Sequence, residues 1–159
     1  MEPLSVASAV VGIVAAAGKM IPTLVIVIST YSDAPKYAKD VLVELQAITA
    51  AVKQLGTFID RKIEVSPLRQ QLVVVQQLQV TLAECVTTYS QLEPILDTLG
   101  SIPAKTAWNR AKWMYKESDI HHILQRLQTH REMLSLILNI LLRYVPTSPV
   151  PQTTKRKPY

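Results

Sequence analysis

Residues 4–30 read LSVASAVVGIVAAAGKMIPTLVIVIST, and this apolar run decides the fold. Lys19 is its one charged residue and Pro22 is its one proline. As an α-helix the run would be about 40 Å long, which exceeds the roughly 30 Å hydrocarbon core of a bilayer. A helix that is apolar nearly all round belongs in the centre of a helical bundle or in a membrane. The run therefore predicts a helix that suits two environments.

Small residues recur at a spacing of four inside this run, at Ser8, Gly12 and Ala16. Such a strip allows another helix to approach closely, either in a bundle or in lipid. Gly12 costs about 1 kcal/mol relative to alanine in a helix interior, so selection for helix stability alone would not retain it. Pro22 predicts a kink or an end of the first helical piece. The alternative interpretation is an ordinary buried core helix.

The composition indicates one all-α domain that folds without disulfides or metals. The chain has 159 residues, four glycines, a net charge of +5 and a single cysteine, Cys85, which we expect in the core or at an interface. A lone cysteine excludes an internal disulfide and fits a reducing compartment. A signal peptide is not expected, because the residues before the apolar run include Glu2 and no Lys or Arg. Lys19 and Pro22 also argue against a permanent membrane anchor.

Two further helices follow the first. One begins at residues 32–35 and ends near residue 60, and its apolar positions are Ala38, Val41, Leu42, Leu45, Ile48, Val52, Leu55 and Ile59. Asp40 and Glu44, a like-charge pair, predict a solvated surface on it. The next helix opens at residues 66–67 and stops at Gly100, with apolar positions at Leu68, Leu72, Val75, Leu78, Leu82, Val86, Tyr89, Leu92 and Leu96. Pro94 predicts a kink there, or an end at the residue before it.

The last helix is predicted to start at the capping pair Ser118-Asp119 and to stop at residues 145–146. The expected fold is a four-helix bundle over residues 1–145, all-α, with a short extra helix at about 104–116 as an open alternative. Residues 146–159 read as a Pro/Thr-rich linker or tail with a basic close.

The segment before the last helix combines tryptophans with basic residues. The candidate anionic-lipid contacts are Lys105, Trp108, Arg110, Lys112, Trp113 and Lys116. Three interpretations stay open: tryptophans that fix a corner of the bundle, an interfacial membrane contact, and a nucleic-acid contact. Nucleic acid is the weakest of these, because the cluster is short and matches no recognised nucleic-acid fold.

The sequence does not favour an enzyme or a metalloprotein. His122 and His130 share a helix face, but no third ligand is placed with them, so we expect solvated histidines and no metal. The sequence contains no G-x-x-x-x-G-K-[ST] phosphate loop. It also places no pair of carboxylates where burial would shift their pKa values for catalysis. No cofactor is expected.

Two blocks resemble a known family. Residues 1–19, MEPLSVASAVVGIVAAAGK, resemble the opening of the fungal N-terminal domain of STAND proteins, the HeLo-like family. Residues 111–141, AKWMYKESDIHHILQRLQTHREMLSLILNIL, resemble its closing block, with Trp113, Lys116-Glu117 and Leu134-Ser135-Leu136 at the matching places. The resemblance covers about residues 1–144.

The resemblance implies an effector module of fungal NOD-like receptors, similar to the HeLo domain of an incompatibility protein and to the four-helix domain of a necroptosis effector. In such relatives oligomerisation releases the first helix, which inserts into the membrane and causes regulated cell death. The inserting residues here would be Leu4, Val6, Val10, Val11, Gly12, Ile13, Val14, Ala16 and Lys19. Implied partners are further copies of the chain, anionic lipids and a receptor nucleotide-binding domain in cis or in trans.

The implied location is the cytoplasm, with relocation to the plasma membrane on activation. The runner-up hypothesis is a soluble helical interaction or oligomerisation module that transmits a signal without membrane insertion. A third possibility, a protein whose first helix is always inserted, would yield no soluble monomer without detergent.

Overall fold

Four long helices form the fold in a computed structural model. The backbone is described for residues 3–30, 36–60, 69–100 and 107–143, and the side chains for residues 6–30, 36–59, 74–99 and 115–143. The helices are α1 (Pro3–Thr30), α2 (Lys36–Asp60), α3 (Arg69–Gly100) and α4 (Ala107–Arg143). The described ranges contain no strand, so the all-α four-helix prediction is confirmed.

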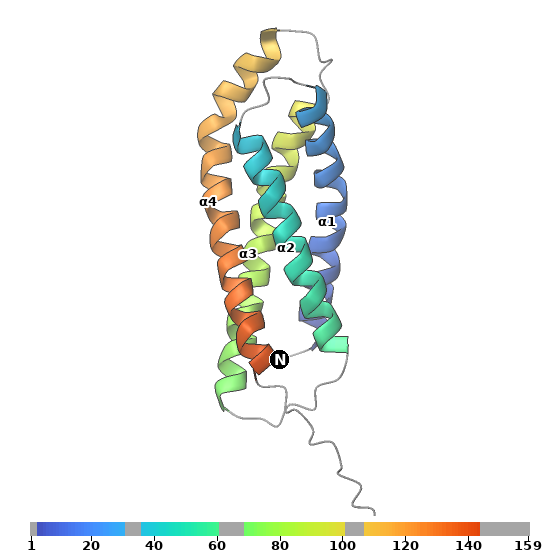
Figure 1. Ribbon diagram of the computed structural model, residues 1–159, viewed down its shortest axis with the longest axis vertical. Coiled ribbons are helices and arrows are strands. Elements are labelled where there is room, and N and C mark those ends of the chain that lie inside the picture. The colour runs from blue at the N-terminus through green and yellow to red at the C-terminus, as the bar shows by residue number, and fades with distance from the viewer. Residues whose placement is uncertain (1–2, 31–35, 61–68, 101–106, 144–159) are drawn as a thin grey trace, which may run out of the picture.

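The helices run alternately up and down, and each packs on two neighbours (Figure 1). α1 packs on α2 and α3, and α4 packs on the same two helices. α1 and α4 therefore occupy opposite corners of the bundle, as do α2 and α3. The consecutive pairs α1–α2 and α3–α4 are antiparallel neighbours, whereas α2 and α3 are antiparallel across the diagonal.

The core follows the apolar spacing that the sequence shows. On α2, Ala38, Val41, Leu45, Ile48, Val52 and Leu55 are all buried. α3 contributes Leu78, Leu82, Cys85, Tyr89, Leu92, Leu96 and Leu99, and α4 contributes Ile120, Ile123, Leu124, Leu127, Leu134, Ile137 and Leu138. Cys85 is in the core as predicted. Val86 was expected there as well, but it is exposed because Cys85 occupies the inward position of that turn.

Both internal prolines lie within continuous helices, so neither proline ends its helix as one form of the prediction required. α1 continues through Pro22 to Thr30, and α3 continues through Pro94 to Gly100. A proline deprives the carbonyl four residues earlier of its N–H partner. Gly18 and Ser90 carry those carbonyls, and they and both prolines lie on exposed sides where water can bind.

The last helix begins earlier than predicted. α4 starts at Ala107, so residues 107–116 are its first turns and do not form a separate short helix. Residues 107–118 contain no Gly or Pro that would interrupt the helix. Ser118 and Asp119 are consequently interior positions, and Asp119 pairs with Lys116 at 3.5 Å instead of capping a new helix.

Candidate functional site: the outer face of the first helix

One side of α1 forms a wall of the core. Val6, Ile13, Ala17, Met20, Leu24 and Val27 are all buried. Their spacing of three, four or seven residues places them along one face of the helix. This face contributes to the same hydrophobic cluster as the inward residues of the other three helices. The packing of α1 is therefore that of a regular core helix on this side.

The opposite side of α1 is also apolar, although it faces outward. Val11 is 68% exposed, Ile26 63% and Val25 46%. Ala15, Gly18, Lys19 and Pro22 complete this exposed side. We call these seven residues the outer α1 face. α1 is long and apolar enough to cross a membrane, yet only 28% of its most apolar window is buried in the bundle.

Polar groups on α1 are few and lack negative charge. Lys19 is the one charged residue between Pro3 and Thr30, and it is exposed. The Thr23 hydroxyl donates to the backbone carbonyl of Lys19 at 3.1 Å, and the Ser29 hydroxyl donates to that of Ile26 at 2.9 Å. Hydroxyls bonded to their own helix need no water, so α1 tolerates an apolar medium better than its composition suggests.

The predicted small-residue strip does not contact another helix along its whole length. Ser8 and Gly12 are exposed, and only Ala16 is partly buried. A Cβ atom added to Gly12 would meet nothing within 4 Å. The strip therefore leaves Gly12 available to a partner outside the bundle, and its role in helix packing in lipid or in an oligomer stays a prediction.

The other predicted insertion residues divide between the two sides of α1. Val6 and Ile13 are buried, Val10 and Val14 are partly buried, and Val11 and Lys19 are exposed. The side chain of Leu4 lies outside the described residues. Sequence reasoning missed Val25 and Ile26 as exposed apolar residues, although they belong to the same apolar run.

The contact of α1 with α2 includes one close approach of the two helices. A Cβ atom added to Gly56 of α2 would lie 3.2 Å from Cγ1 of Val10. The absent side chain at Gly56 thus gives Val10 the room it occupies. On the other flank, Val6 and Ala9 line a small hollow together with Leu82 and Gln79 of α3.

One described residue, Lys116, belongs to the predicted anionic-lipid contacts. α4 carries the basic segment and lies diagonally opposite α1. Lys105 and the side chains of Trp108, Arg110, Lys112 and Trp113 lie outside the described residues. Lys116 is described: its Nζ atom is 3.5 Å from Asp119 and 5.7 Å from the ring centre of Tyr115.

A buried ion pair joins α2 to α4. Oε2 of Glu44 lies 2.8 Å from Nε of Arg131, and the Glu44 side chain is only 8% exposed. The prediction of a solvated Glu44 is therefore wrong. Glu44 is buried because Arg131 of α4 supplies a guanidinium that neutralises its carboxylate. A buried charge persists only with such a partner.

Polar contacts also join α3 to α4. The Thr88 hydroxyl lies 2.9 Å from Nε2 of His130, whose Nδ1 is 3.9 Å from the Glu84 carboxylate. Arg126 donates to the side-chain carbonyl of Gln91 at 2.7 Å. His130 is buried, contrary to the prediction of a solvated histidine, because the adjacent Thr88 hydroxyl binds its ring. Burial lowers the pKa of His130 below its ordinary 6.5; Glu84 partly opposes this and Arg126 adds to it.

The order hydroxyl, imidazole and carboxylate in Thr88, His130 and Glu84 is that of a catalytic triad, but the geometry does not support catalysis. The Thr88 residue is 2% exposed, and its hydroxyl contacts the His130 ring. The 3.9 Å between Nδ1 and the carboxylate exceeds hydrogen-bond length. These residues border an open groove of about 700 Å³ between α3 and α4, which His122 also lines. We interpret the arrangement as a structural contact between the helices.

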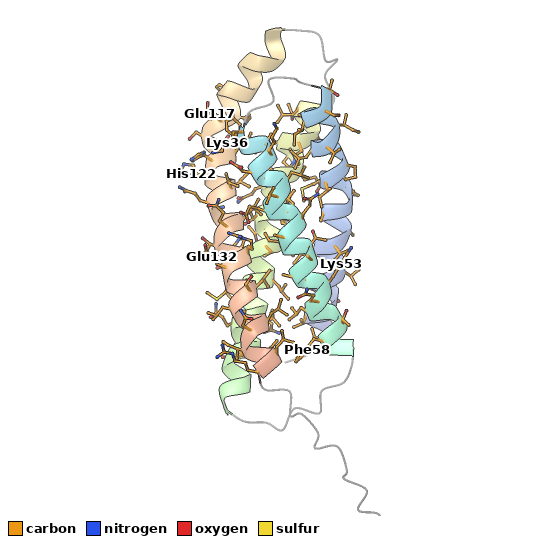
Figure 2. All side chains as sticks on the ribbon, in the orientation of Figure 1. Lys36, Lys53, Phe58, Glu117, His122 and Glu132 are labelled. Atoms are coloured by element: carbon orange, nitrogen blue, oxygen red, sulfur yellow. The ribbon has the colours of Figure 1, made fainter. Side chains whose placement is uncertain are left out.

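The described side chains form no group of three His, Cys, Asp or Glu residues that could hold a metal ion. The thiol of Cys85 is not a reactive nucleophile, because burial, assisted by the nearby Glu84 charge, raises its pKa to about 12. Polar and charged side chains such as Lys36, Lys53, Glu117, His122 and Glu132 project from α2 and α4 (Figure 2). The outer α1 face is an apolar helix surface with a single charged residue, and we take it as the candidate binding surface.

Comparison with known proteins gave one family. The family model described as pigment biosynthesis cluster protein PigL N-terminal matches residues 1–147. No curated protein and no solved structure matches the chain.

Proposed function

Because the chain belongs to the family of the pigment biosynthesis cluster protein PigL N-terminal domain, which is found in fungal proteins, we propose that it is an effector module of a fungal NOD-like receptor type protein. In this proposal several copies are brought together by a receptor nucleotide-binding domain, in cis or in trans. Their α1 helices then insert into the plasma membrane and cause regulated cell death, as in heterokaryon incompatibility and innate immunity. The proposal assigns the domain no catalytic role.

The observation that carries the proposal is the two-sided apolar character of α1. Five of its buried side chains, Val6, Ile13, Met20, Leu24 and Val27, would lose about 10 kcal/mol of hydrophobic stabilisation if α1 were released into water. Release into lipid restores that contribution, because acyl chains are as apolar as the core. The outer α1 face adds no opposing carboxylate. We therefore expect release to be coupled to insertion and rare in solution.

A disulfide that fixes α1 to α2 tests the proposal. In a disulfide the Cβ atom of one cysteine lies about 3.0 Å from the sulfur of the other, since the S–S bond is about 2.05 Å. Cγ1 of Val10 is 3.2 Å from the position of a Cβ on Gly56, which is close to the distance that a disulfide between Val10→Cys and Gly56→Cys requires. The native thiol of Cys85 is buried and would not compete.

The assay is dye release from anionic vesicles by the full chain, clustered by fusion to an oligomeric carrier. We expect release by the reduced double variant and by a Gly56→Cys control. Release should cease on oxidation of the double variant and return on reduction. A protein lacking residues 1–20 should release nothing. Equal release from the oxidised and reduced forms, or from the truncated protein, would contradict the proposal.

The second candidate is a soluble module that transmits a signal through the intact bundle. The complete burial of the inward face of α1 favours it, because that packing needs no other environment. It predicts that no form of the clustered protein releases dye, while the folded bundle still binds its partner chain.

A further inference from the structure

We infer that the resting bundle, with α1 still packed in place, docks on an anionic lipid surface through the outer α1 face. The inference rests on the proposed function and adds an earlier step to it. Docking and insertion are then separate events, and only the second one requires α1 to leave α2 and α3.

The face has the length and composition of an interfacial contact. Val11 and Ile26 mark its ends, and both are more than half exposed. They are separated by about 22 Å along the helix axis at a rise of about 1.5 Å per residue. An α-helix that lies in the plane of the interface buries such an apolar side among the headgroups and the first acyl carbons. The intact bundle can do this without rearrangement, because the inward face of α1 stays in the core.

The charges around the face favour an anionic surface. Lys19 lies within the face, and α1 has no carboxylate between Pro3 and Thr30. Lys53, exposed on α2, lies one helical turn before Gly56, whose Cβ position meets Val10, and so adds a second cation on the side of α2 that faces α1 (Figure 2). Among the described residues, Asp97 of α3 is an opposing charge beside the face, since it lines a surface hollow with Thr23, Ile26 and Val27. The half of the face from Val11 to Lys19 should therefore approach the membrane most closely.

The same charge argues against a second copy of the chain as the occupant. In a two-fold contact the centre of a surface meets its own copy. Lys19 lies near the midpoint between Val11 and Ile26, so a self-pairing of this face would bring two Lys19 side chains together. Like charges repel in such a contact, whereas an anionic membrane attracts the same lysine. Charge complementarity thus selects lipid over self-association.

The test measures vesicle co-sedimentation of the oxidised Val10→Cys/Gly56→Cys protein, in which α1 cannot leave. The vesicles contain phosphatidylcholine with or without phosphatidylserine. We expect binding to the anionic vesicles without dye release, and weaker binding at high salt. Circular dichroism and thermal unfolding establish that each variant is folded, so loss of binding is assigned only to folded protein.

Matched variants locate the contact. Lys19→Gln should weaken binding about fivefold, whereas Arg126→Gln on α4, the opposite corner, should leave it within about twofold. Val11→Glu should weaken binding by about tenfold or more, and Val43→Glu on the outer side of α2 should have little effect. Asp97→Asn should strengthen it. Equal effects of each variant and its control would overturn the assigned face.

The outcomes separate the inference from the proposed function. If the oxidised protein does not bind while the reduced clustered protein binds and releases dye, docking by the resting bundle is wrong and the proposed function stands. If both forms bind but neither releases dye, docking is supported and the proposed function is wrong. If neither form binds nor releases dye, both are wrong.

Discussion

Removing Arg131 should destabilise the protein far more than removing Glu44, although the two form one ion pair. The Glu44 carboxylate is 8% exposed and its Arg131 partner is 42% exposed, with 2.8 Å between Oε2 and Nε. Arg131→Met leaves a buried carboxylate without its cation, which costs about 3–5 kcal/mol in a fully buried site. Because water can reach the vacated position of a half-exposed arginine, we expect about 2–3 kcal/mol here.

Glu44→Met should destabilise the protein much less, because the guanidinium of Arg131, which is 42% exposed, can turn into solvent when its partner is removed. We expect a change in unfolding free energy of less than about 1 kcal/mol, and a double variant that also lies within about 1 kcal/mol of the parent. Urea unfolding and calorimetry measure both quantities, and Arg131→Met should lower Tm by about 5–10 °C in a chain of this size. The reasoning is refuted if Arg131→Met is nearly neutral, or if the double variant is as unstable as Arg131→Met alone.

Three further predictions concern single residues. Burial holds the pKa of His130 below 6.5, so the folded state binds fewer protons than the unfolded state and the unfolding free energy should fall as pH drops below 6.5. In His130→Gln this fall in unfolding free energy should be smaller, which urea titrations at about pH 7.5 and about pH 5.5 would measure. An unchanged pH dependence would contradict the lowered pKa of His130 in the folded state. Gly12→Ala should raise stability by about 0.5–1 kcal/mol in thermal unfolding, because the added Cβ meets nothing within 4 Å; a lower Tm would show an unrecognised contact. Maleimide should label Cys85 slowly in the folded protein and quickly in urea, and rapid labelling of the folded chain would refute its burial.

The amphipathic helices were predictable because the spacing of apolar residues at the helical period sets which side of each helix is buried. On α2 the spacing of apolar residues selected the core positions from Ala38 to Leu55 correctly. Spacing failed where a partner from another helix decides the outcome. Glu44 and His130 look like solvated residues in isolation, and they are buried because Arg131 and Thr88 supply a charge and a hydroxyl. No local pattern contains that information.

The candidate site was predictable as a segment but not as a surface. In a helix that is apolar all round, Val10, Val11 and Ile13 are equivalent by composition, and only packing against α2 and α3 turns Ile13 inward and leaves Val11 exposed. The same packing places Lys19 outward and near the middle of the exposed side.

The kinds of contact on the two opposite corners differ in a way that fits the proposed function. α4 packs on α2 and α3 through apolar core residues and also through polar pairs, such as Arg131 with Glu44 and His130 with Thr88. Such contacts are lost outright when the partner is removed, because a charge or ring nitrogen is left unpaired. The core contacts of α1, made by residues such as Ile13 and Leu24, are apolar and therefore available in any apolar medium. In the proposed function α1 exchanges these apolar contacts for lipid, whereas α4 would also have to give up its polar pairs. If α1 inserts, we therefore expect α2, α3 and α4 to keep their polar contacts. Adding His130→Gln to the oxidised Val10→Cys/Gly56→Cys protein should then lower the stability of the bundle without restoring dye release.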